Sequence, residues 1–185
     1  MNRKEAIPYV AGNDYHGAFT MTEHLIELGH RRIAFLMGPR NMRSSFDRLY
    51  GFRAALDAHG LSVPPEHIKD SEFTFDGGLV AAKELLAAEP SITAIFAGND
   101  SSAFGAMFAC QEAGLRIPDD ISICGYDDLP AAKATYPGLT TMHQPSGELI
   151  EHAARLLIQL LKDTPIPQQQ IVLPTHLVVR GSTGP

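Results

Sequence analysis

The chain has 185 residues, 44% of them hydrophobic, and a formal net charge of −6 at pH 7. This length and apolar content suffice for a sizeable core in one large domain or two small ones. An acidic chain lacks the basic stripe that phosphate binding needs, so this chain alone is a poor candidate for binding DNA. The only two cysteines, Cys110 and Cys124, exclude a disulfide scaffold and are expected to be buried, reduced thiols.

Neither a secretion signal nor a membrane span is visible in the sequence. The first nine residues contain charges and no apolar run of signal length. No stretch reaches the ~18 apolar residues that a spanning helix needs. We therefore expect a cytoplasmic protein without membrane contact.

Strand and helix patterns alternate along the chain, which predicts an α/β fold with a doubly wound parallel sheet covered by helices on both faces. The run at 32–37 is continuously apolar, as in a strand buried on both sides. Glycines or prolines follow most of the helical patterns. The predicted strands are 7–11, 32–37, 67–70, 93–97, 121–124, 170–173 and 176–179, and the predicted helices are 18–28, 44–59, 76–88, 101–113 and 145–162.

The helix at 145–162 has an unusually regular apolar stripe, which must be covered by another part of the molecule. A connector rich in proline and glutamine follows it at 164–170. The stripe consists of Leu149, Ile150, Ala153, Leu156, Leu157, Leu160 and Leu161.

Polar and aromatic residues follow the predicted strands at 38–48, 71–75, 98–100 and 125–128. In a doubly wound sheet, ligands bind beyond the carboxyl ends of the strands. Carboxylates and guanidinium groups can each bind two hydroxyls in forked geometry, and an aromatic ring covers the apolar face of a sugar or base. These loops therefore favour a polyhydroxylated ligand.

Local structural roles remain open for several of these residues. Asp127 follows a glycine and is equally compatible with capping a turn. Arg48 is equally compatible with a solvated position on its helix. Asn99 and Asp100 precede a helix, where an N-cap is favoured for Asp100 and left open for Asn99.

Six stretches match, in the same order along the chain, the sequence motifs of one protein family. They are His24-Leu-Ile-Glu-Leu-Gly-His-Arg-Arg-Ile-Ala34, Arg48-Leu-Tyr-Gly-Phe52, Ala94-Ile-Phe-Ala-Gly-Asn-Asp100, Gly114-Leu-Arg-Ile-Pro-Asp-Asp-Ile-Ser122, Gly125-Tyr-Asp-Asp128 and Pro137-Gly-Leu-Thr-Thr-Met-His-Gln-Pro145. They resemble the effector-binding region of the LacI/GalR family of bacterial transcription regulators.

The resemblance implies a periplasmic-binding-protein-like fold of two subdomains with a small effector, often a sugar or nucleoside-like metabolite, between them. It also implies a homodimer that uses the helix at 101–113 and the segment near Tyr136. By position in the family pattern, the effector contacts fall on Ser44, Arg48, Phe73, Asn99, Asp127 and Gln144.

The chain departs from the family pattern at its N-terminal side. The helix-turn-helix that reads operator DNA and most of the N-terminal subdomain are absent, so the chain is expected to be a truncated member. The expected parts are a nearly complete C-terminal subdomain at 13–143, a remnant of the N-terminal subdomain at 144–173 and a return strand at 174–182. The stripe at 145–162 should then be less buried than the core, with Leu156 and Leu160 more exposed than Ile95 or Ile123.

Enzyme motifs are missing from the sequence. No phosphate-binding glycine loop, no nucleophile elbow and no His-Glu-x-x-His pattern occurs, and the eight histidines lack metal-ligand spacing. Asp127 and Asp128 are adjacent, so in a strand they point to opposite faces and would not form an acid/base pair. We expect no enzyme, no cofactor and no metal. The alternative function is a solute-binding protein of a sugar transport system.

Overall fold

A computed structural model describes residues 7–162 and 164–185. Its larger part is a six-stranded sheet with the strand order β3-β2-β4-β5-β6-β8. The first five strands are parallel, and β8 pairs antiparallel with β6 at the edge. The strands are β2 (Ile33–Met37), β3 (Ile68–Asp70), β4 (Ala94–Ala97), β5 (Ser122–Asp127), β6 (Thr140–His143) and β8 (His176–Val178).

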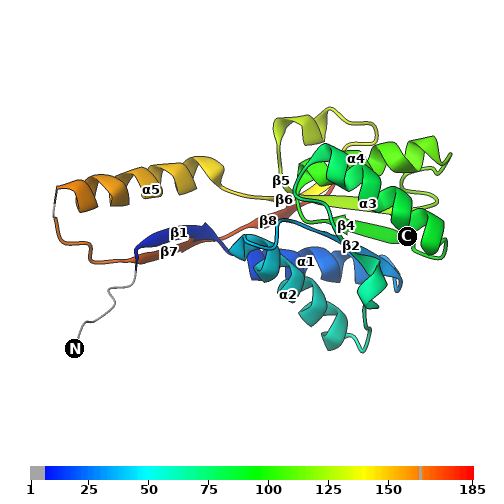
Figure 1. Ribbon diagram of the computed structural model, residues 1–185, viewed down its shortest axis with the longest axis horizontal. Coiled ribbons are helices and arrows are strands. Elements are labelled where there is room, and N and C mark those ends of the chain that lie inside the picture. Colours follow the sequence, from blue (N-terminus) through cyan, green and yellow to red (C-terminus); the bar gives the residue numbers. More distant parts are fainter. Residues whose placement is uncertain (1–6, 163) are drawn as a thin grey trace.

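Four helices cover the two faces of this sheet (Figure 1). The pair α1 (Asp14–Glu27) and α2 (Arg43–Ala58) lies on one face, and α3 (Phe75–Ala88) and α4 (Asp100–Glu112) lie on the other. Neighbouring residues of one strand serve opposite faces: Phe35 joins the cluster under α1 and α2, while Leu36 joins the cluster under α3 and α4. The expected three-layer α/β fold is therefore confirmed.

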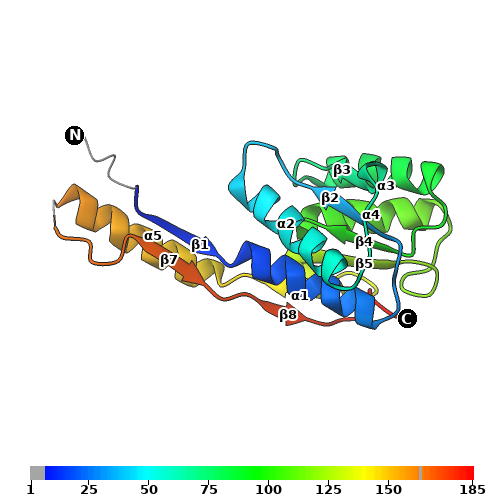
Figure 2. The ribbon, with the colours of Figure 1, turned by 90° about the horizontal axis from the view of Figure 1, so that it is seen from below.

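A smaller arm extends from the sheet unit (Figures 1 and 2). It consists of β1 (Tyr9–Gly12), β7 (Gln170–Leu173) and α5 (Ser146–Leu161). The two strands pair in parallel although they are far apart in the sequence, and α5 contacts β1. We call these three elements the arm, and the rest of the described chain the sheet unit.

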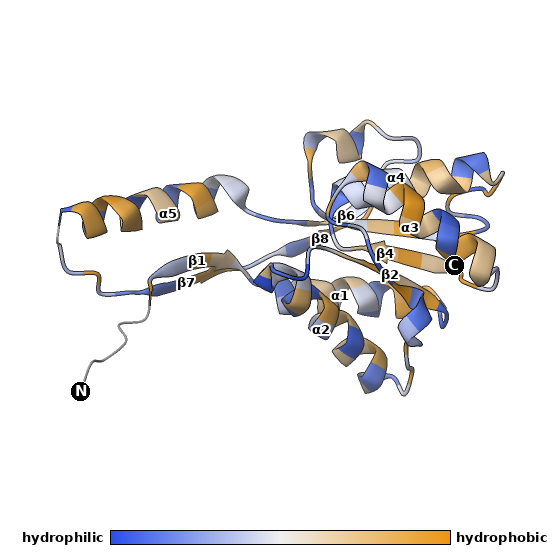
Figure 3. Cartoon of the chain, in the orientation of Figure 1, coloured by the Kyte–Doolittle hydropathy of each residue, from blue (hydrophilic) through white to orange (hydrophobic). Residues whose placement is uncertain are grey.

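The apolar stripe of α5 is largely uncovered (Figure 3). Leu156 is the only buried residue of this helix and is 7% exposed, whereas Leu160 is 51% exposed. Ile95 and Ile123 in the sheet unit are completely buried. The expected difference is confirmed, and it is large for Leu160 and small for Leu156.

Three elements differ from the sequence prediction by more than two residues, one of them β5, which continues to Asp127 instead of ending at Cys124. Helix α1 begins at Asp14 rather than at residue 18, because the Asn13 side chain caps it by accepting a hydrogen bond from the His16 amide at 3.3 Å. Strand β6 was not predicted, because it is only four residues long and lies between turn-forming prolines. Both cysteines are free and buried, as expected. Within residues 7–162 and 164–185, no helix has the length and apolar character to cross a membrane.

Candidate functional site

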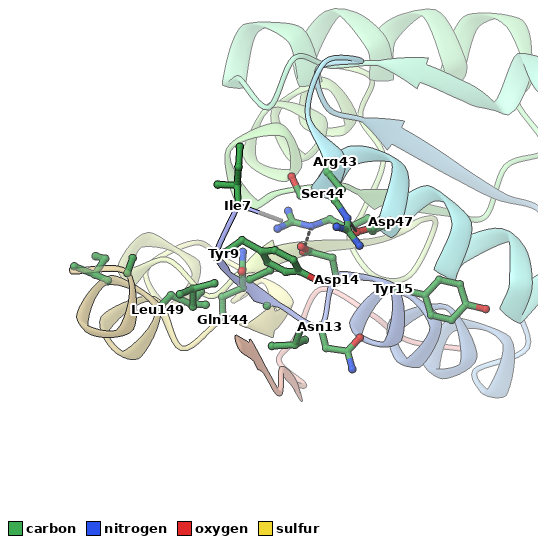
Figure 4. A pocket seen from close by; sticks show the side chains of 17 residues that line it. Ile7, Tyr9, Asn13, Asp14, Tyr15, Arg43, Ser44, Asp47, Gln144 and Leu149 are labelled. Atoms are coloured by element: carbon green, nitrogen blue, oxygen red, sulfur yellow. Dashed lines mark hydrogen bonds and ion pairs between the residues drawn. The ribbon is translucent and has the colours of Figure 1, made fainter. Parts of the chain in front are cut away.

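A cleft of about 1140 Å³ lies where the sheet unit meets the arm (Figure 4). The sheet unit contributes the start of α1 and the first turns of α2, and the arm contributes β1, β7 and α5. Two of the expected contacts, Ser44 and Arg48, line it from α2, and Gln144 lines it from the crossing between the two parts. The cleft is therefore polar on one wall and apolar, with Leu149, Ile150 and Val172, on the other.

Arg48 is the centre of the polar wall. Its side chain is buried, and its Nε donates to Asp14 Oδ1 at 2.7 Å while Nη1 donates to the Gly98 carbonyl at 2.5 Å. The guanidinium carbon lies 3.8 Å from the centre of the Tyr126 ring and 5.4 Å from that of Phe73. The alternative of a solvated Arg48 is wrong, because these contacts fix the guanidinium between two aromatic rings.

Asp127, at the carboxyl end of β5, supports the polar wall from directly behind Arg48 and Gln144. Its Oδ1 lies 3.5 Å from Arg48 Nη1 and accepts a hydrogen bond from Gln144 Nε2 at 2.7 Å. Burial raises the pKa of Asp127, and the Arg48 charge and the Gln144 bond oppose that rise. The side chain therefore forms an ion pair in the cleft wall instead of capping a turn.

Asn99 and Phe73 support this wall from behind. Asn99 is the N-cap of α4: its Oδ1 accepts from the Ser102 amide at 2.9 Å and its Nδ2 donates to the Phe73 carbonyl at 3.0 Å. The preference for Asp100 as the cap is wrong, since Asp100 is the first residue of the helix and is fully buried. Phe73 itself has a left-handed φ of 57° and its ring lies against Gly38, where a Cβ would approach Phe73 Cζ to 2.1 Å.

The six expected residues are thus only partly gathered around the cleft. Ser44, Arg48 and Gln144 line it, and Asp127 lies directly behind Arg48 and Gln144. Phe73 does not line the cleft, and its ring contacts the Arg48 guanidinium. Asn99 lies one step further away and donates a hydrogen bond to the Phe73 carbonyl.

Sequence reasoning missed Asp14, the carboxylate that holds Arg48 in place. The sequence did contain a signal for Asp14. It directly follows Asn13, the N-cap, and so places a second hydrogen-bond acceptor in the first turn of α1. The expected divergence of Asp127 and Asp128 is confirmed: Asp128 turns away to Arg180 Nη2 at 2.5 Å and His143 Nδ1 at 3.0 Å.

The chemistry of this wall suits hydrogen bonding to a ligand. The described residues contain no cluster of three or more His, Cys, Asp or Glu able to hold a metal ion. Both thiols are buried, and burial raises their pKa, that of Cys110 to about 12, which makes them poor nucleophiles. What the cleft offers is a fixed carboxylate–guanidinium pair, an amide and aromatic faces, the groups that bind neutral polar ligands.

Comparisons with known proteins agree with this geometry. Residues 22–183 match the model of the periplasmic binding protein-like domain. The chain is 36% identical over 97% of its length to the transcriptional regulator CelR of Thermobifida fusca, and 38% identical over 94% of its length to the ribose operon repressor of Escherichia coli K12. A LacI family regulator from Enterococcus faecium, solved with bound ribose, superimposes with a TM-score of 0.87 at 32% identity, covering all of this chain and 68% of that one. The chain belongs to the LacI family.

Within the LacI family the match is to one region. The chain spans about half the length of the curated relatives, 53% of CelR and 52% of the ribose repressor. The structure of a CelR–cellobiose complex superimposes with a TM-score of 0.93 over 97% of this chain and 55% of that one. Because nearly the whole chain superimposes, the arm and the sheet unit have the arrangement found in that LacI-family structure.

Proposed function

We propose that the chain senses a sugar or sugar-like effector as part of a LacI-type transcription regulator. The observation that carries this proposal is the ion pair of the buried Arg48 with the partly buried Asp127, held by Asp14, Gln144 and two aromatic rings beside the cleft. Two LacI-family structures were solved with cellobiose and with ribose, which supports a carbohydrate as the ligand class. The proposed contacts are Ser44, Arg48, Phe73, Asn99, Asp127 and Gln144.

The chemistry of a sugar fits this wall. Adjacent ring hydroxyls can donate to Asp127 and accept from Arg48, since a carboxylate has only acceptors and a guanidinium only donors. Bonds to charged groups are worth roughly 1.5–3 kcal/mol each, more than those between neutral groups. Because the pair is already ordered, little conformational entropy is lost when the ligand binds.

NMR titration of the chain with ribose, cellobiose and adenosine tests the proposal. We expect at least one of them to shift the amide signals of Gly98 and Asp127, and Arg48→Met to abolish these shifts. Arg53→Met is the matched control, because Arg53 is on the same helix but exposed. The absence of shifts with every ligand, or shifts confined to the face of α3 and α4, would contradict the proposal.

The proposed regulator contains more than this region. The proposed division is an effector-binding subdomain at 13–143, a piece of the second subdomain at 144–173 and a return strand at 174–182, and the separation of the sheet unit from the arm supports it. Operator DNA would be bound by a helix-turn-helix outside these residues, in the cytoplasm, and no catalytic activity is proposed. Sequencing the DNA upstream of Met1 separates this function from solute transport: a helix-turn-helix in frame supports the regulator, and a secretion signal supports the transport protein.

We further propose that the chain forms a homodimer through an apolar patch on α4. A hollow between α4 and the loop at 135–137 is lined by aromatic side chains, with Phe108 43% exposed and Tyr136 fully exposed. The Phe75 and Phe108 rings lie 6.0 Å apart across this patch. Apolar patches of this kind mark protein–protein interfaces.

Sedimentation velocity at micromolar concentration tests the dimer. We expect a dimer for the wild type and a monomer for Phe108→Glu, because a buried carboxylate without a partner opposes association. Tyr50→Glu, a change at another exposed aromatic residue on α2, should leave the dimer intact. A monomeric wild type would contradict the proposal.

A further inference from the structure

The turn that carries Asp127 has an unfavourable backbone. Asp127 and Asp128 are consecutive and both have left-handed φ angles, 119° and 58°, which non-glycine residues rarely adopt. Such conformations persist only where the surrounding structure holds them. Contacts with the surrounding structure must therefore stabilise the backbone of the residues that follow β5.

Asp100 is placed to hold this turn. It is fully buried at the start of α4, and its Oδ2 accepts a hydrogen bond from the Leu129 amide at 2.7 Å. Its Oδ1 accepts from Thr141 Oγ1 on β6 at 2.6 Å. One carboxylate therefore ties α4 and β6 to the residue directly after the Asp127–Asp128 pair.

Asp100 packs closely against β5. A Cβ at Gly125, two residues before Asp127, would approach Asp100 Oδ1 to 2.3 Å. The carboxylate thus lies directly on the backbone of β5, and glycine at 125 is what permits it.

No positive charge balances this carboxylate among the contacts of the described residues. Asp127 and Asp128 are close enough to repel its charge, while Arg48 pairs with Asp127, and Arg180 and His143 pair with Asp128. The other titratable neighbour is the buried thiol of Cys124 on β5. Burial, and to a lesser extent the two aspartates, raise the pKa of Asp100 to about 6, against the opposing effect of its two hydrogen bonds.

We propose that Asp100 is a positioning residue for Asp127: its ionised carboxylate holds the Leu129 amide and so keeps the effector-binding turn in place, and protonation weakens that hold. When Asp100 gains a proton, Thr141 can become the acceptor, but the Leu129 amide then donates to a neutral oxygen. Hydrogen bonds to ionised acceptors are roughly twice as strong as those to neutral ones. Effector sensing therefore becomes sensitive to mildly acidic pH. The pH sensitivity of effector sensing rests on the proposed function. The hydrogen bond from the Leu129 amide to Asp100 can be measured without any effector.

Hydrogen exchange of the Leu129 amide, measured by NMR on the whole chain across pH, tests the hold. For local openings that release the Leu129 amide but leave Asp100 buried, the charged carboxylate loses a hydrogen bond and regains no solvent, so we expect the protection factor of Leu129 in the wild type to fall as the pH drops through about 6. In Asp100→Asn, which mimics the neutral form with the same shape, we expect a protection factor about tenfold lower and no such step. Asp76→Asn, in the exposed first turn of α3, is the matched control and should behave as the wild type.

A second variant separates titration of Asp100 from a general loss of structure. Thr141→Val keeps the carboxyl group and removes one of its two donors, so the midpoint of the step should move to higher pH. A midpoint that stays in place, or a Leu129 amide that is equally protected in Asp100→Asn, would overturn the proposal.

The NMR signal of the Gln144 side-chain amide reports the position of Asp127, because this amide donates a hydrogen bond to the Asp127 carboxylate. We expect the Gln144 signal to move toward that of a solvated amide in Asp100→Asn, and affinity for the sugar that binds to fall several-fold at neutral pH. An unchanged Gln144 signal would overturn the positioning role. If no sugar binds the wild type, the proposed function fails, and the Leu129 and Gln144 signals still decide the role of Asp100.

Discussion

The sheet unit and the arm contain similar apolar residues but bury them very differently. In the sheet unit, Phe35, Phe52 and Phe96 are completely buried and their rings pack together, with the Phe35 and Phe52 centres 5.0 Å apart. In the arm, Ile150 is 70% and Leu161 78% exposed. The sheet unit therefore contains its own core, whereas most of the apolar face of α5 is uncovered by the described residues, with Leu156 as the exception. The cleft has the same asymmetry: its polar wall is held by ion pairs and hydrogen bonds, and its apolar wall includes the exposed Ile150 of α5.

Removing a buried ring should produce the largest loss of stability. Phe52→Ala is expected to lower the free energy of unfolding by about 3–5 kcal/mol, because the ring leaves a cavity that the surrounding core cannot refill. Urea denaturation followed by circular dichroism measures this loss. A loss below about 1 kcal/mol would show that the core is looser than the burial indicates.

Breaking the ion pair in the cleft wall should have the next largest effect. Asp14→Ala removes the nearest carboxylate partner of the buried Arg48. We expect a loss of about 3 kcal/mol, at the lower end for a buried pair because Asp127 still lies 3.5 Å from Nη1. Asp57→Ala, at an exposed position on α2, is the control for the same denaturation experiment and should change little.

Titration of Asp100 should appear as a pH dependence of stability. Its pKa is 3.8 in the unfolded chain and about 6 in the folded one, so the folded state binds the proton more tightly. The wild type should therefore lose stability relative to Asp100→Asn as the pH rises from about 4 to about 6, by roughly 3 kcal/mol in total. Parallel denaturation of both proteins across this range measures the difference, and a constant difference would contradict the burial of the charge.

Changes on the arm should have the smallest effect. Leu157 is 57% exposed, so Leu157→Ala should alter the free energy of unfolding by less than about 0.5 kcal/mol. The same substitution at Leu85, which is completely buried in the sheet unit, should cost about 2–5 kcal/mol. Similar losses at the two sites would mean that α5 is covered in solution, and the contrast between the two regions would then fail.

The sequence predicted most of the sheet unit because its strands are continuous apolar runs and its helices end at glycines. Strand β6 was not predicted. Its four residues lie between prolines and form a strand only by pairing with β5 and β8, which the local sequence does not show. The same limit applies to the cleft. Arg48 and Asp127 were found from the positions of the strand ends, but the role of Asp14 depends on a contact between two helices. Asp100 was taken for a cap, because its partners Leu129 and Thr141 are distant in the chain.

The most direct test of the account is the affinity of Asp127→Ala for the sugar that binds the wild type, measured by calorimetry. Two hydrogen bonds to a charged group would be lost, so we expect the dissociation constant to rise by about a hundredfold or more. Asp119→Ala, at an exposed aspartate that pairs with Arg116, should bind as the wild type does. Unchanged affinity in Asp127→Ala would contradict the claim that the ligand is bound at the polar wall of the cleft, where Asp127 pairs with Arg48.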